Sequence, residues 1–255
     1  MPRSVAMITG ARGGLGGAIA LALAKRGHDL VLNDLDMSRD LFALAADLRT
    51  FGGRVEIMPQ DIGQVQQLPG YVAEVVARMG GLDVLVNNAG VSVLSRGDLL
   101  DVTPESFDRC IAVNMRAQFF LTQAVARHML AAPAARRRTI ITVTSVAVDQ
   151  IIGKVLAEYS ISKAGLAHMV QHFAARLAPE NIDCFEIRPG MMQTEMTSTS
   201  REKYDRLIAE GFVPAGRWGS LDEIGKVIAT MASGEFSYAV GQAIHIDGGM
   251  RFKTF

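Results

Sequence analysis

Residues 5–17 read VAMITGARGGLGG, and this stretch decides the fold. Val5 to Thr9 is a β-type run of strand length, and Gly16 to Arg26, rich in Ala and Leu, is predicted to be a helix. The glycines between them let the backbone turn tightly and approach a pyrophosphate, whose charge is met by N–H groups at the start of the helix. Many flexible loops are rich in glycine, but this one joins a strand to a helix, which favours a dinucleotide site.

The rest of the chain repeats this alternation of short apolar runs and helical stretches. Further strands are predicted at Leu30 to Asn33, Val55 to Met58, Val84 to Val86, Ile140 to Thr144, Asp183 to Ile187 and Ala243 to Ile246. Further helices are predicted at Arg39 to Phe51, Leu68 to Met79, Pro104 to Leu130 and Ala157 to Leu177. Strands that are apolar throughout, with helices between them, indicate parallel strands joined by right-handed crossovers. We therefore expect one α/β domain over residues 1–255, a doubly wound parallel sheet of the Rossmann type.

Composition excludes several classes of function. The 255 residues include 26 basic and 26 acidic side chains, so no net charge attracts nucleic acid or an anionic membrane. No stretch reaches the ~18 apolar residues of a membrane-spanning helix, and the apolar run near the start is too short for a signal-peptide core. The two cysteines, Cys110 and Cys184, fall in different predicted elements, which suits a reducing compartment. We expect a cytoplasmic protein with a small-molecule substrate and no nucleic-acid or membrane partner.

Asp34 follows the second predicted strand, 18 residues past Gly16. A carboxylate there accepts hydrogen bonds from the adenosine ribose hydroxyls and repels an additional 2′-phosphate, which favours NAD over NADP. Asp36 is the alternative residue for this contact with the ribose. Arg12 argues for NADP, because a guanidinium can pair with the 2′-phosphate.

Two later strand ends extend the predicted nucleotide site. Asp61, with Ile62, is placed to hold the adenine amino group, and a plain strand-end turn is the alternative. The small and amide residues after the strand Val84 to Val86 suit close packing against a nucleotide, with an Asn-rich turn as the alternative. They are Asn87, Asn88, Ala89 and Gly90.

Tyr159 and Lys163 are four residues apart in a predicted helix, so their side chains share one face. A phenol has an ordinary pKa near ~10, and a neighbouring ammonium favours its ionised form. Lowering that pKa to about 7 takes roughly 4 kcal/mol, which is plausible in a dry cleft that also holds a cationic ring. Alone, such a pair is common on protein surfaces, so the interpretation depends on the residues upstream.

Ser145 and Asn114 are those upstream residues. Ser145 ends a predicted strand at the sheet edge, where its hydroxyl can bond an oxygen that gains negative charge; Thr144 is its substitute. Asn114 is an amide in an apolar part of a long predicted helix. A buried amide needs partners, and either a water chain toward Lys163 or a helix–helix hydrogen bond supplies them.

Three further features have simpler interpretations. Met191 to Pro214 is irregular, with a short charged helix near Arg201 to Glu210, and is placed to cover a ligand cleft. His168 and His172 have metal-ligand spacing, but no third ligand is suggested near them, so we expect no metal. The basic triplet at residues 136–138 is interpreted as a solvated loop.

Together these residues resemble the short-chain dehydrogenase/reductase family, in particular the single-domain group that includes bacterial β-ketoacyl-carrier-protein reductases and polyol, sugar and steroid dehydrogenases. The resemblance covers nearly the whole chain. The matching motifs are the Thr9 to Gly16 loop, Asp61, Asn87 to Gly90, Asn114, Ser145, Tyr159 to Lys163, Pro189-Gly190 with Thr194, and Gly241 to Gly249.

The resemblance implies that Tyr159 is the catalytic acid/base and that Lys163 lowers its pKa and binds the nicotinamide ribose. It implies that Ser145 orients the substrate oxygen and that Asn114 anchors a proton-relay water. Thr194 would touch the nicotinamide carboxamide. The implied cofactor site consists of Gly10, Arg12, Gly14, Leu15, Gly16, Asp34, Asp61, Ile62, Asn88, Ala89, Gly90, Tyr159, Lys163, Pro189, Gly190 and Thr194.

The expected activity is hydride transfer between a nicotinamide cofactor and a secondary alcohol or ketone, with NAD favoured and NADP as the alternative. Gly13 supports NAD, since NADP-dependent members often carry a basic residue there. Ser145 precedes Tyr159 by 14 positions, one more than is common, and the loop between them is polar. Its polar residues suit a sugar, polyol or other polar hydroxy compound; they are Asp149, Gln150, Lys154 and Glu158.

The alternative functions are a 3-oxoacyl-carrier-protein reductase and, from another class, a dinucleotide-binding regulator without turnover. Such a regulator would be expected to lose Tyr159 or Lys163, and both are present. The family also suggests a homodimer or homotetramer formed through the helices at Pro104 to Leu130 and Ala157 to Leu177.

Overall fold

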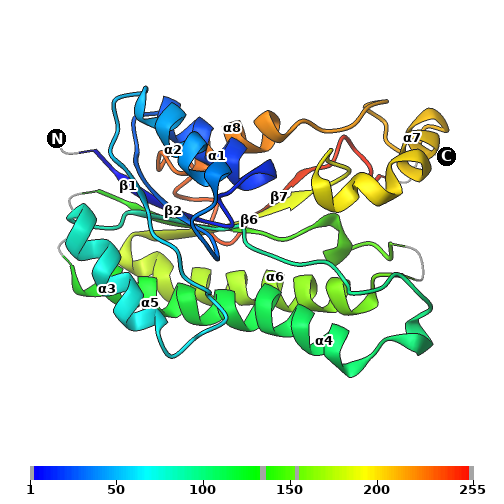
Figure 1. The fold of residues 1–255 in the computed structure, drawn as a ribbon, viewed down its shortest axis with the longest axis horizontal. Coiled ribbons are helices and arrows are strands. Elements are labelled where there is room, and N and C mark those ends of the chain that lie inside the picture. Colours follow the sequence, from blue (N-terminus) through cyan, green and yellow to red (C-terminus); the bar gives the residue numbers. More distant parts are fainter. Residues whose placement is uncertain (1–2, 133–135, 153–154, 253–255) are drawn as a thin grey trace.

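The computed structural model describes residues 3–132, 136–152 and 155–252, which form a parallel sheet between two layers of helices (Figure 1). The sheet has seven strands in the order β3-β2-β1-β4-β5-β6-β7, and each neighbouring pair is parallel. The strands are β1 (Val5–Thr9), β2 (Asp29–Asn33), β3 (Val55–Ile57), β4 (Val84–Asn87), β5 (Arg138–Val143), β6 (Ile182–Pro189) and β7 (Ala243–Ile246). This is the predicted doubly wound fold.

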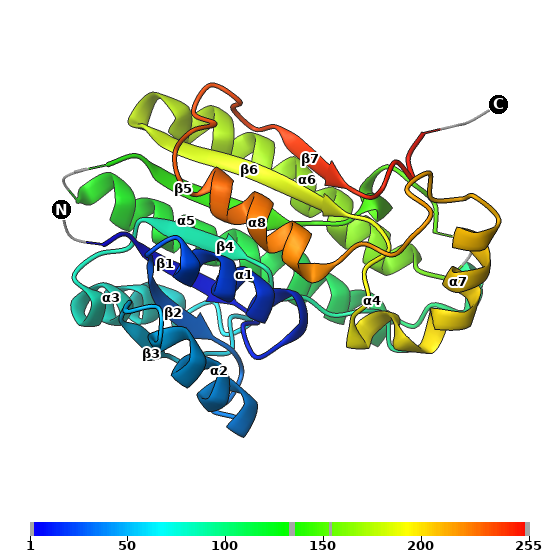
Figure 2. The ribbon, with the colours of Figure 1, turned by 90° about the horizontal axis from the view of Figure 1, so that it is seen from above.

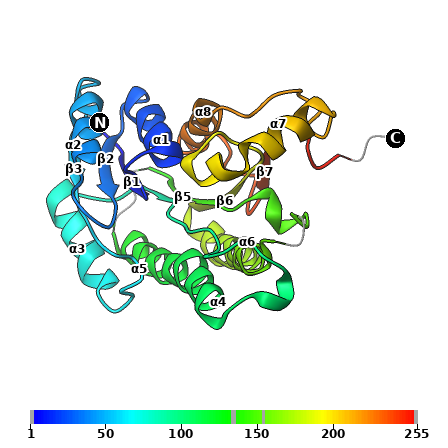
Figure 3. The same cartoon turned by 45° about the vertical axis from the view of Figure 1, so that its right-hand side comes forward.

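The helices divide between the two faces of the sheet, as Figure 3 shows. One face is covered by α1 (Gly14–Lys25), α2 (Arg39–Arg49) and α8 (Leu221–Met231). The other is covered by α3 (Leu68–Met79), α4 (Pro104–Cys110), α5 (Gln118–Ala131) and α6 (Ala157–Leu177). The short helix α7 (Arg201–Ala209) lies beyond the carboxyl ends of the strands (Figure 2).

Single-turn and irregular helices connect these elements. They are η1 (Leu99–Asp101), the π-helix η2 (Ile111–Ala117), η3 (Val146–Val148), η4 (Ala178–Glu180) and η5 (Glu195–Ser200). The predicted helix Pro104 to Leu130 is therefore three consecutive segments, α4, η2 and α5. No helix in the described part of the chain is long and apolar enough to cross a membrane.

Two apolar cores lie on the two faces of the sheet, because side chains along a strand alternate. In β1, Ala6 and Ile8 join the core under α1 and α8, whereas Val5 and Met7 join the core under α3 and α5. A third, smaller cluster lies under α7. Its buried members are Val146, Met191, Val213 and Met250.

Two sequence predictions about the sheet and its flanks are wrong. The strands are not all apolar, because β6 buries Asp183, Glu186 and Arg188. The basic triplet is not a solvated loop: Arg138 starts β5 and is buried, and Arg137 forms a two-pronged ion pair with Asp183 at 2.7 and 3.0 Å.

Candidate active site

The carboxyl ends of the parallel strands bring the sequence-predicted residues to one edge of the sheet. The glycine-rich loop follows β1, Asp34 follows β2, and Asn88 to Gly90 follow β4. Ser145 lies just past β5, and Gly190 follows β6. Ligands of open α/β sheets bind at this edge.

The glycine-rich loop has the shape of a phosphate-binding turn. Gly10 and Gly14 adopt positive φ angles of 64° and 53°, which glycine tolerates and other residues avoid. A Cβ on Gly16 would overlap with the carbonyl oxygen of Gly10, so only glycine fits there. No side chain caps the first turn of α1, and its N–H groups carry the positive end of the helix dipole. This donor set fits an anionic pyrophosphate.

Asp34 lies at the carboxyl edge of the sheet and stabilises the glycine-rich loop through hydrogen bonds. Its Oδ2 accepts from the Arg12 backbone N–H at 2.9 Å, and its Oδ1 accepts from the Leu35 N–H at 2.9 Å. The Arg12 guanidinium lies 3.9 Å from Asp36, and both of these side chains are mostly exposed. Each oxygen of the Asp34 carboxylate retains a second lone pair for further donors.

The residues after β3 and β4 also form internal hydrogen bonds. Asp61 Oδ1 accepts from the Gly63 N–H at 2.8 Å, which is the strand-end turn given as the alternative, and Ile62 is buried in the core. Asn88 Nδ2 donates to the carbonyl oxygens of Thr9 and Gly10 at 2.9 and 3.1 Å. Asn88 thus holds the glycine-rich loop against β4.

Tyr159 and Lys163 lie together at the amino end of α6, as their spacing predicts. Lys163 Nζ is 5.8 Å from the centre of the Tyr159 ring and donates to the Val143 carbonyl oxygen at 2.9 Å. Burial lowers the pKa of Lys163 to about 8, and the charge of Glu186 opposes this shift.

Ser145 hydrogen-bonds to the Tyr159 phenol. Burial raises the pKa of Tyr159, and the bond with Ser145 opposes that rise. The expected lowering by Lys163 is not found here; desolvation has the larger effect, so the phenol is held in its neutral form. Thr144 is not a substitute for Ser145, because its hydroxyl donates to Glu186 at 2.5 Å.

Asn114 is fully buried within the π-helix η2. Its Oδ1 accepts from the Val91 N–H at 2.8 Å, and its Nδ2 donates to the Val91 carbonyl at 3.0 Å and to Ser162 Oγ at 3.0 Å. This matches the alternative of a helix–helix link, since Ser162 lies on α6. A Cβ on Gly90 would lie 3.2 Å from Asn114 Oδ1 and 3.6 Å from Lys163 Nζ, so both polar atoms flank the same glycine.

The segment that follows β6 also lies at the carboxyl edge of the sheet. A Cβ on Gly190 would lie 2.6 Å from the Asp247 Cα, so the backbone of residues 189–190 passes close to the residue after β7. Thr194 precedes η5 and bonds to Thr197 through its N–H at 3.0 Å. Tyr204 of α7 is close enough to Tyr159 to act on its pKa, which it raises.

Three of the four polar residues in the loop before Tyr159 bind other parts of the protein instead of forming the expected substrate surface. Asp149 pairs with Arg188 and His245, Gln150 donates to the Met250 carbonyl, and Glu158 is buried with its Oε1 accepting from Ser106 Oγ at 2.6 Å. Lys154 lies outside the described residues. The side chains have protein partners because the loop folds back onto β6, β7 and α4.

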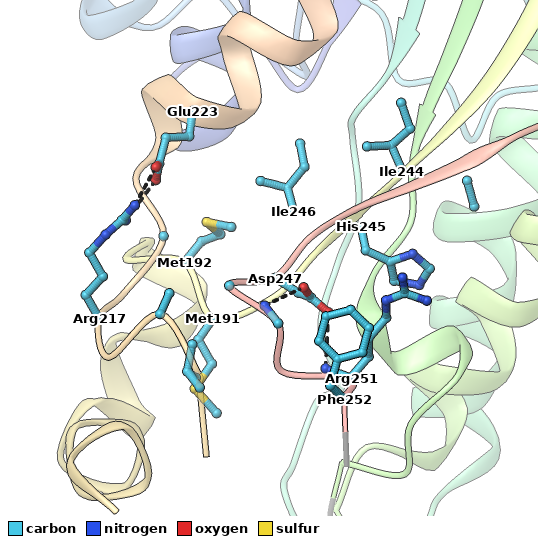
Figure 4. A pocket seen from close by; sticks show the side chains of 16 residues that line it. Met191, Met192, Arg217, Glu223, Ile244, His245, Ile246, Asp247, Arg251 and Phe252 are labelled. Carbon is cyan, nitrogen blue, oxygen red and sulfur yellow. Dashed lines mark hydrogen bonds and ion pairs between the residues drawn. The ribbon is translucent and has the colours of Figure 1, made fainter. Parts of the chain in front are cut away.

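A cavity of about 580 Å³ opens along the free edge of β7, and none of the four candidate catalytic residues lines it. Figure 4 shows the Arg217–Glu223 ion pair on one wall, and Asp247, His245 and Phe252 across from it.

His168 and His172 contact each other on the exposed surface of α6, with 3.3 Å between their Nε2 atoms. No group of three or more possible metal ligands occurs in the ranges that the structure describes.

Sequence reasoning missed Glu186 and Arg188, which lie under α6 beside the candidate residues. Both are buried, and Arg188 Nε and Nη2 donate to the two oxygens of Glu186 at 2.7 and 2.9 Å. A signal was available in the sequence, since Glu186 falls in a strand predicted to be buried, Arg188 directly follows that strand, and a buried charge needs a partner.

Comparison with known proteins agrees with this arrangement. The profile of a family described as "Enoyl-(Acyl carrier protein) reductase" matches residues 10–251. The 3-oxoacyl-[acyl-carrier-protein] reductase FabG of Thermotoga maritima is 35% identical, covering 96% of this chain and 97% of that protein. The 2-dehydro-3-deoxy-D-gluconate 5-dehydrogenase of Escherichia coli is 32% identical, covering 96% and 94%.

Among solved structures, a 3-oxoacyl-[acyl-carrier protein] reductase from Brucella melitensis in complex with NAD superimposes with a TM-score of 0.95. It is 42% identical and covers 100% of both chains. The similarity therefore includes every element that contributes to the carboxyl edge.

Proposed function

Because the chain belongs to the short-chain dehydrogenase/reductase family, we propose that Asn114, Ser145, Tyr159 and Lys163 are the catalytic site of an NAD-linked dehydrogenase of polar hydroxy compounds. As a family member it is an oxidoreductase that acts on secondary alcohol or ketone groups with a nicotinamide cofactor. The observation that carries the proposal is the meeting of the Tyr159 phenol, the Ser145 hydroxyl and the Lys163 ammonium at the edge that the glycine-rich loop also reaches.

A bound nicotinamide ring would supply the acceptor or donor of hydride. In this mechanism, Tyr159 Oη donates a proton to the carbonyl oxygen during reduction and accepts it from the hydroxyl during oxidation. Ser145 Oγ bonds the same substrate oxygen and orients it. The raised pKa of Tyr159 keeps a proton available for reduction at neutral pH. Oxidation needs the phenolate, and in this proposal the Lys163 ammonium and the positive charge of a bound nicotinamide ring would together offset the burial of the phenol.

NAD is the cofactor that the chain's residues suit best. The loop with Gly10, Gly14 and Gly16 would bind the pyrophosphate of NAD. Asp34 would bind the adenosine ribose. An anionic Asp34 disfavours a 2′-phosphate, and Arg12 offers that phosphate only an exposed guanidinium beside Asp36. We assign the nicotinamide end to Lys163, Pro189, Gly190 and Thr194, and the adenine end to Asp61 and Ile62.

Two substrate classes fit the comparisons. A sugar acid or other polar hydroxy compound is supported by the Escherichia coli relative, whose name gives 2-dehydro-3-deoxy-D-gluconate, and by a neutral chain that does not attract an acidic carrier protein. A 3-oxoacyl thioester is supported by the names of the Thermotoga and Brucella proteins. Exposed apolar side chains on the segments that follow Gly90 and Ser145 also suit an acyl chain; they are Leu94 and Ile151.

We further propose a cytoplasmic homodimer or homotetramer assembled through α4, α5 and α6. Phe119 and Phe120 of α5 and Ile161 of α6 are each more than a third exposed, which is costly for apolar side chains that remain in water.

We also propose that residues 191–214 cover the substrate. Their cluster under α7 includes Val146, next to Ser145.

A substrate screen with both cofactors tests the proposed function. The purified protein is assayed at the reduced-nicotinamide absorbance band with sugar acids, polyols and 3-hydroxyacyl thioesters, on both coenzyme A and carrier protein. NAD-dependent turnover of a sugar acid or polyol is expected. Turnover of acyl thioesters alone would favour the carrier-protein reductase, and cofactor binding without any turnover would favour the regulator.

A further inference from the structure

Three charged side chains, Glu186, Arg188 and Asp149, and the imidazole of His245 form a continuous chain of close polar contacts beneath the amino end of α6, called here the ion-pair chain. Arg188 holds Glu186 with two bonds, at 2.7 and 2.9 Å, and its Nη1 reaches Asp149 Oδ2 at 2.5 Å. His245 Nε2 lies 2.9 Å from the same Asp149 oxygen. Glu186 is 1% exposed and Arg188 9%, so both are desolvated groups that depend on each other.

This ion-pair chain holds both ends of the turn that carries Ser145. Thr144, the residue before Ser145, donates its hydroxyl to Glu186 at 2.5 Å. Asp149, four residues after Ser145, binds Arg188. Because Glu186 and Arg188 are two apart on β6 and face the same side, one rigid strand fixes both attachments.

The same carboxylate lies near Lys163. Lys163 Nζ bonds to the Val143 carbonyl, next to Thr144, which bonds to Glu186. Burial lowers the pKa of Lys163, and Glu186 is the strongest influence that opposes this. The other titratable groups around this amine are Cys110 of α4 and Tyr159 one turn earlier on α6. Cys110 is a buried thiol whose pKa is raised by burial, so Glu186 is the carboxyl group that opposes the effect of burial on Lys163.

We propose that Glu186 and Arg188 are positioning residues for the reaction: they anchor both ends of the turn Thr144–Asp149, and Glu186 supplies the negative charge that keeps Lys163 an ammonium. This inference rests on the proposed roles of Ser145 and Lys163. It also gives the loop residue Asp149 a structural task instead of a substrate contact. Figure 4 places His245, the end of the ion-pair chain, at the cavity beside β7.

The first test is the titration of Lys163 in Glu186→Gln. The chain has six lysines, so the side-chain signals of labelled lysine can be resolved by NMR, and Lys163→Met identifies the right one. Lys163 is expected to lose its proton at lower pH in Glu186→Gln than in wild type, by roughly one pH unit. An unchanged titration of Lys163 would overturn the electrostatic part of the proposal.

Kinetics test the consequence for the reaction. In Glu186→Gln, the alkaline limb of kcat/KM is expected to move to lower pH together with the Lys163 titration. Asp149→Asn keeps the shape of the side chain but removes the charge, so kcat is expected to fall roughly 10-fold, with the KM for NAD unchanged. A normal kcat in Asp149→Asn would contradict the anchoring of the Ser145 turn.

Asp183→Asn is the matched control. Asp183 lies on the same strand and forms the same kind of two-pronged ion pair, with Arg137, at the amino end of β6. We expect Asp183→Asn to change neither the pH profile nor kcat. If Asp183→Asn changed the pH profile and kcat as much as Glu186→Gln does, the loss of any buried charge from β6 would disturb the protein. That result would refute a specific role for Glu186.

Two further arrangements keep the test decisive. If Glu186→Gln does not fold because Arg188 is left unpaired, the double variant Glu186→Gln/Arg188→Gln removes both charges, and the same Lys163 shift is expected. If wild type shows no turnover with any substrate, the proposed function fails. The NMR titration still decides whether Glu186 acts on Lys163.

Discussion

The Lys163 side chain is 4% exposed, and keeping its charge inside the protein costs stability. Its pKa falls from 10.5 to about 8 on folding, so the unfolded state binds the proton more tightly. The penalty is complete below pH 8 and disappears as the pH rises toward 10.5. A residue retained at such a cost is expected to serve function.

Lys163→Met should therefore be more stable than wild type at pH 7, by about 2 kcal/mol once the lost hydrogen bond to Val143 is subtracted. The difference should shrink between pH 8 and pH 10. Urea unfolding at several pH values measures it, and a less stable Lys163→Met at pH 7 would contradict the argument.

Asp34 offers a second test at the residue scale. Asp34→Asn keeps an acceptor for the Arg12 N–H. It removes the charge that, in the proposed cofactor site, would face a 2′-phosphate. We expect the ratio of kcat/KM for NADP to that for NAD to rise at least about 10-fold. Asp36→Asn, an exposed aspartate two residues later, is the control and should leave this ratio unchanged. An equal rise in both variants would show a general effect of charge and not a specific contact.

At the scale of elements, the sequence predicts regular periodic segments well. The bounds of β1, α3, α6 and β7 agree with prediction, because their apolar patterns end at clear turns. The helix α8 was missed, although Ser220 and Glu223 form a capping box at its start. The π-turn around Asn114 could not be predicted, since an inserted turn leaves the helical apolar pattern almost unchanged.

The candidate site was predictable in part for the same reason. Spacing on α6 places Tyr159 beside Lys163, and strand ends place Ser145 and Asp34 at one edge. Partners from distant strands leave no periodic signal, so the pairing of Asp149 with Arg188 and His245 was not foreseen. Asp149, Gln150 and Glu158 were therefore assigned to the substrate, although they form hydrogen bonds within the protein.

The contact between α1 and α8 provides a prediction at this scale. A Cβ on Gly225 of α8 would lie 2.7 Å from the Ala18 carbonyl oxygen of α1, so Gly225→Ala must push the helices apart. We expect a loss of about 1–3 kcal/mol in unfolding free energy. In Gly70→Ala, on α3, the new methyl group meets no atom within 4 Å, and a gain of about 0.5–1 kcal/mol is expected. Thermal unfolding measures the stability of both variants. Equal changes in unfolding free energy in Gly225→Ala and Gly70→Ala would contradict close packing of α1 on α8.

At the scale of the whole molecule, the proposed assembly depends on the α5 and α6 face. Phe120 is 36% exposed there, and Phe42 on α2, at 51%, is an exposed phenylalanine on the opposite layer. Phe120→Asp should reduce the mass of the particle in light scattering, whereas Phe42→Asp should not. A wild-type monomer, or equal masses in all three proteins, would contradict assembly through α5 and α6.

The parallel sheet brings the Tyr159 phenol and the glycine-rich loop to one carboxyl edge, where the proposed function makes the phenol the proton-transfer group and the loop part of the dinucleotide site. The most direct measurement compares turnover and cofactor affinity in wild type and Tyr159→Phe, which lacks only the phenol oxygen. We predict that kcat/KM falls by at least about 10²-fold while the Kd for NADH stays within about twofold. Full activity in Tyr159→Phe would contradict the account, because the proton would then come from another group.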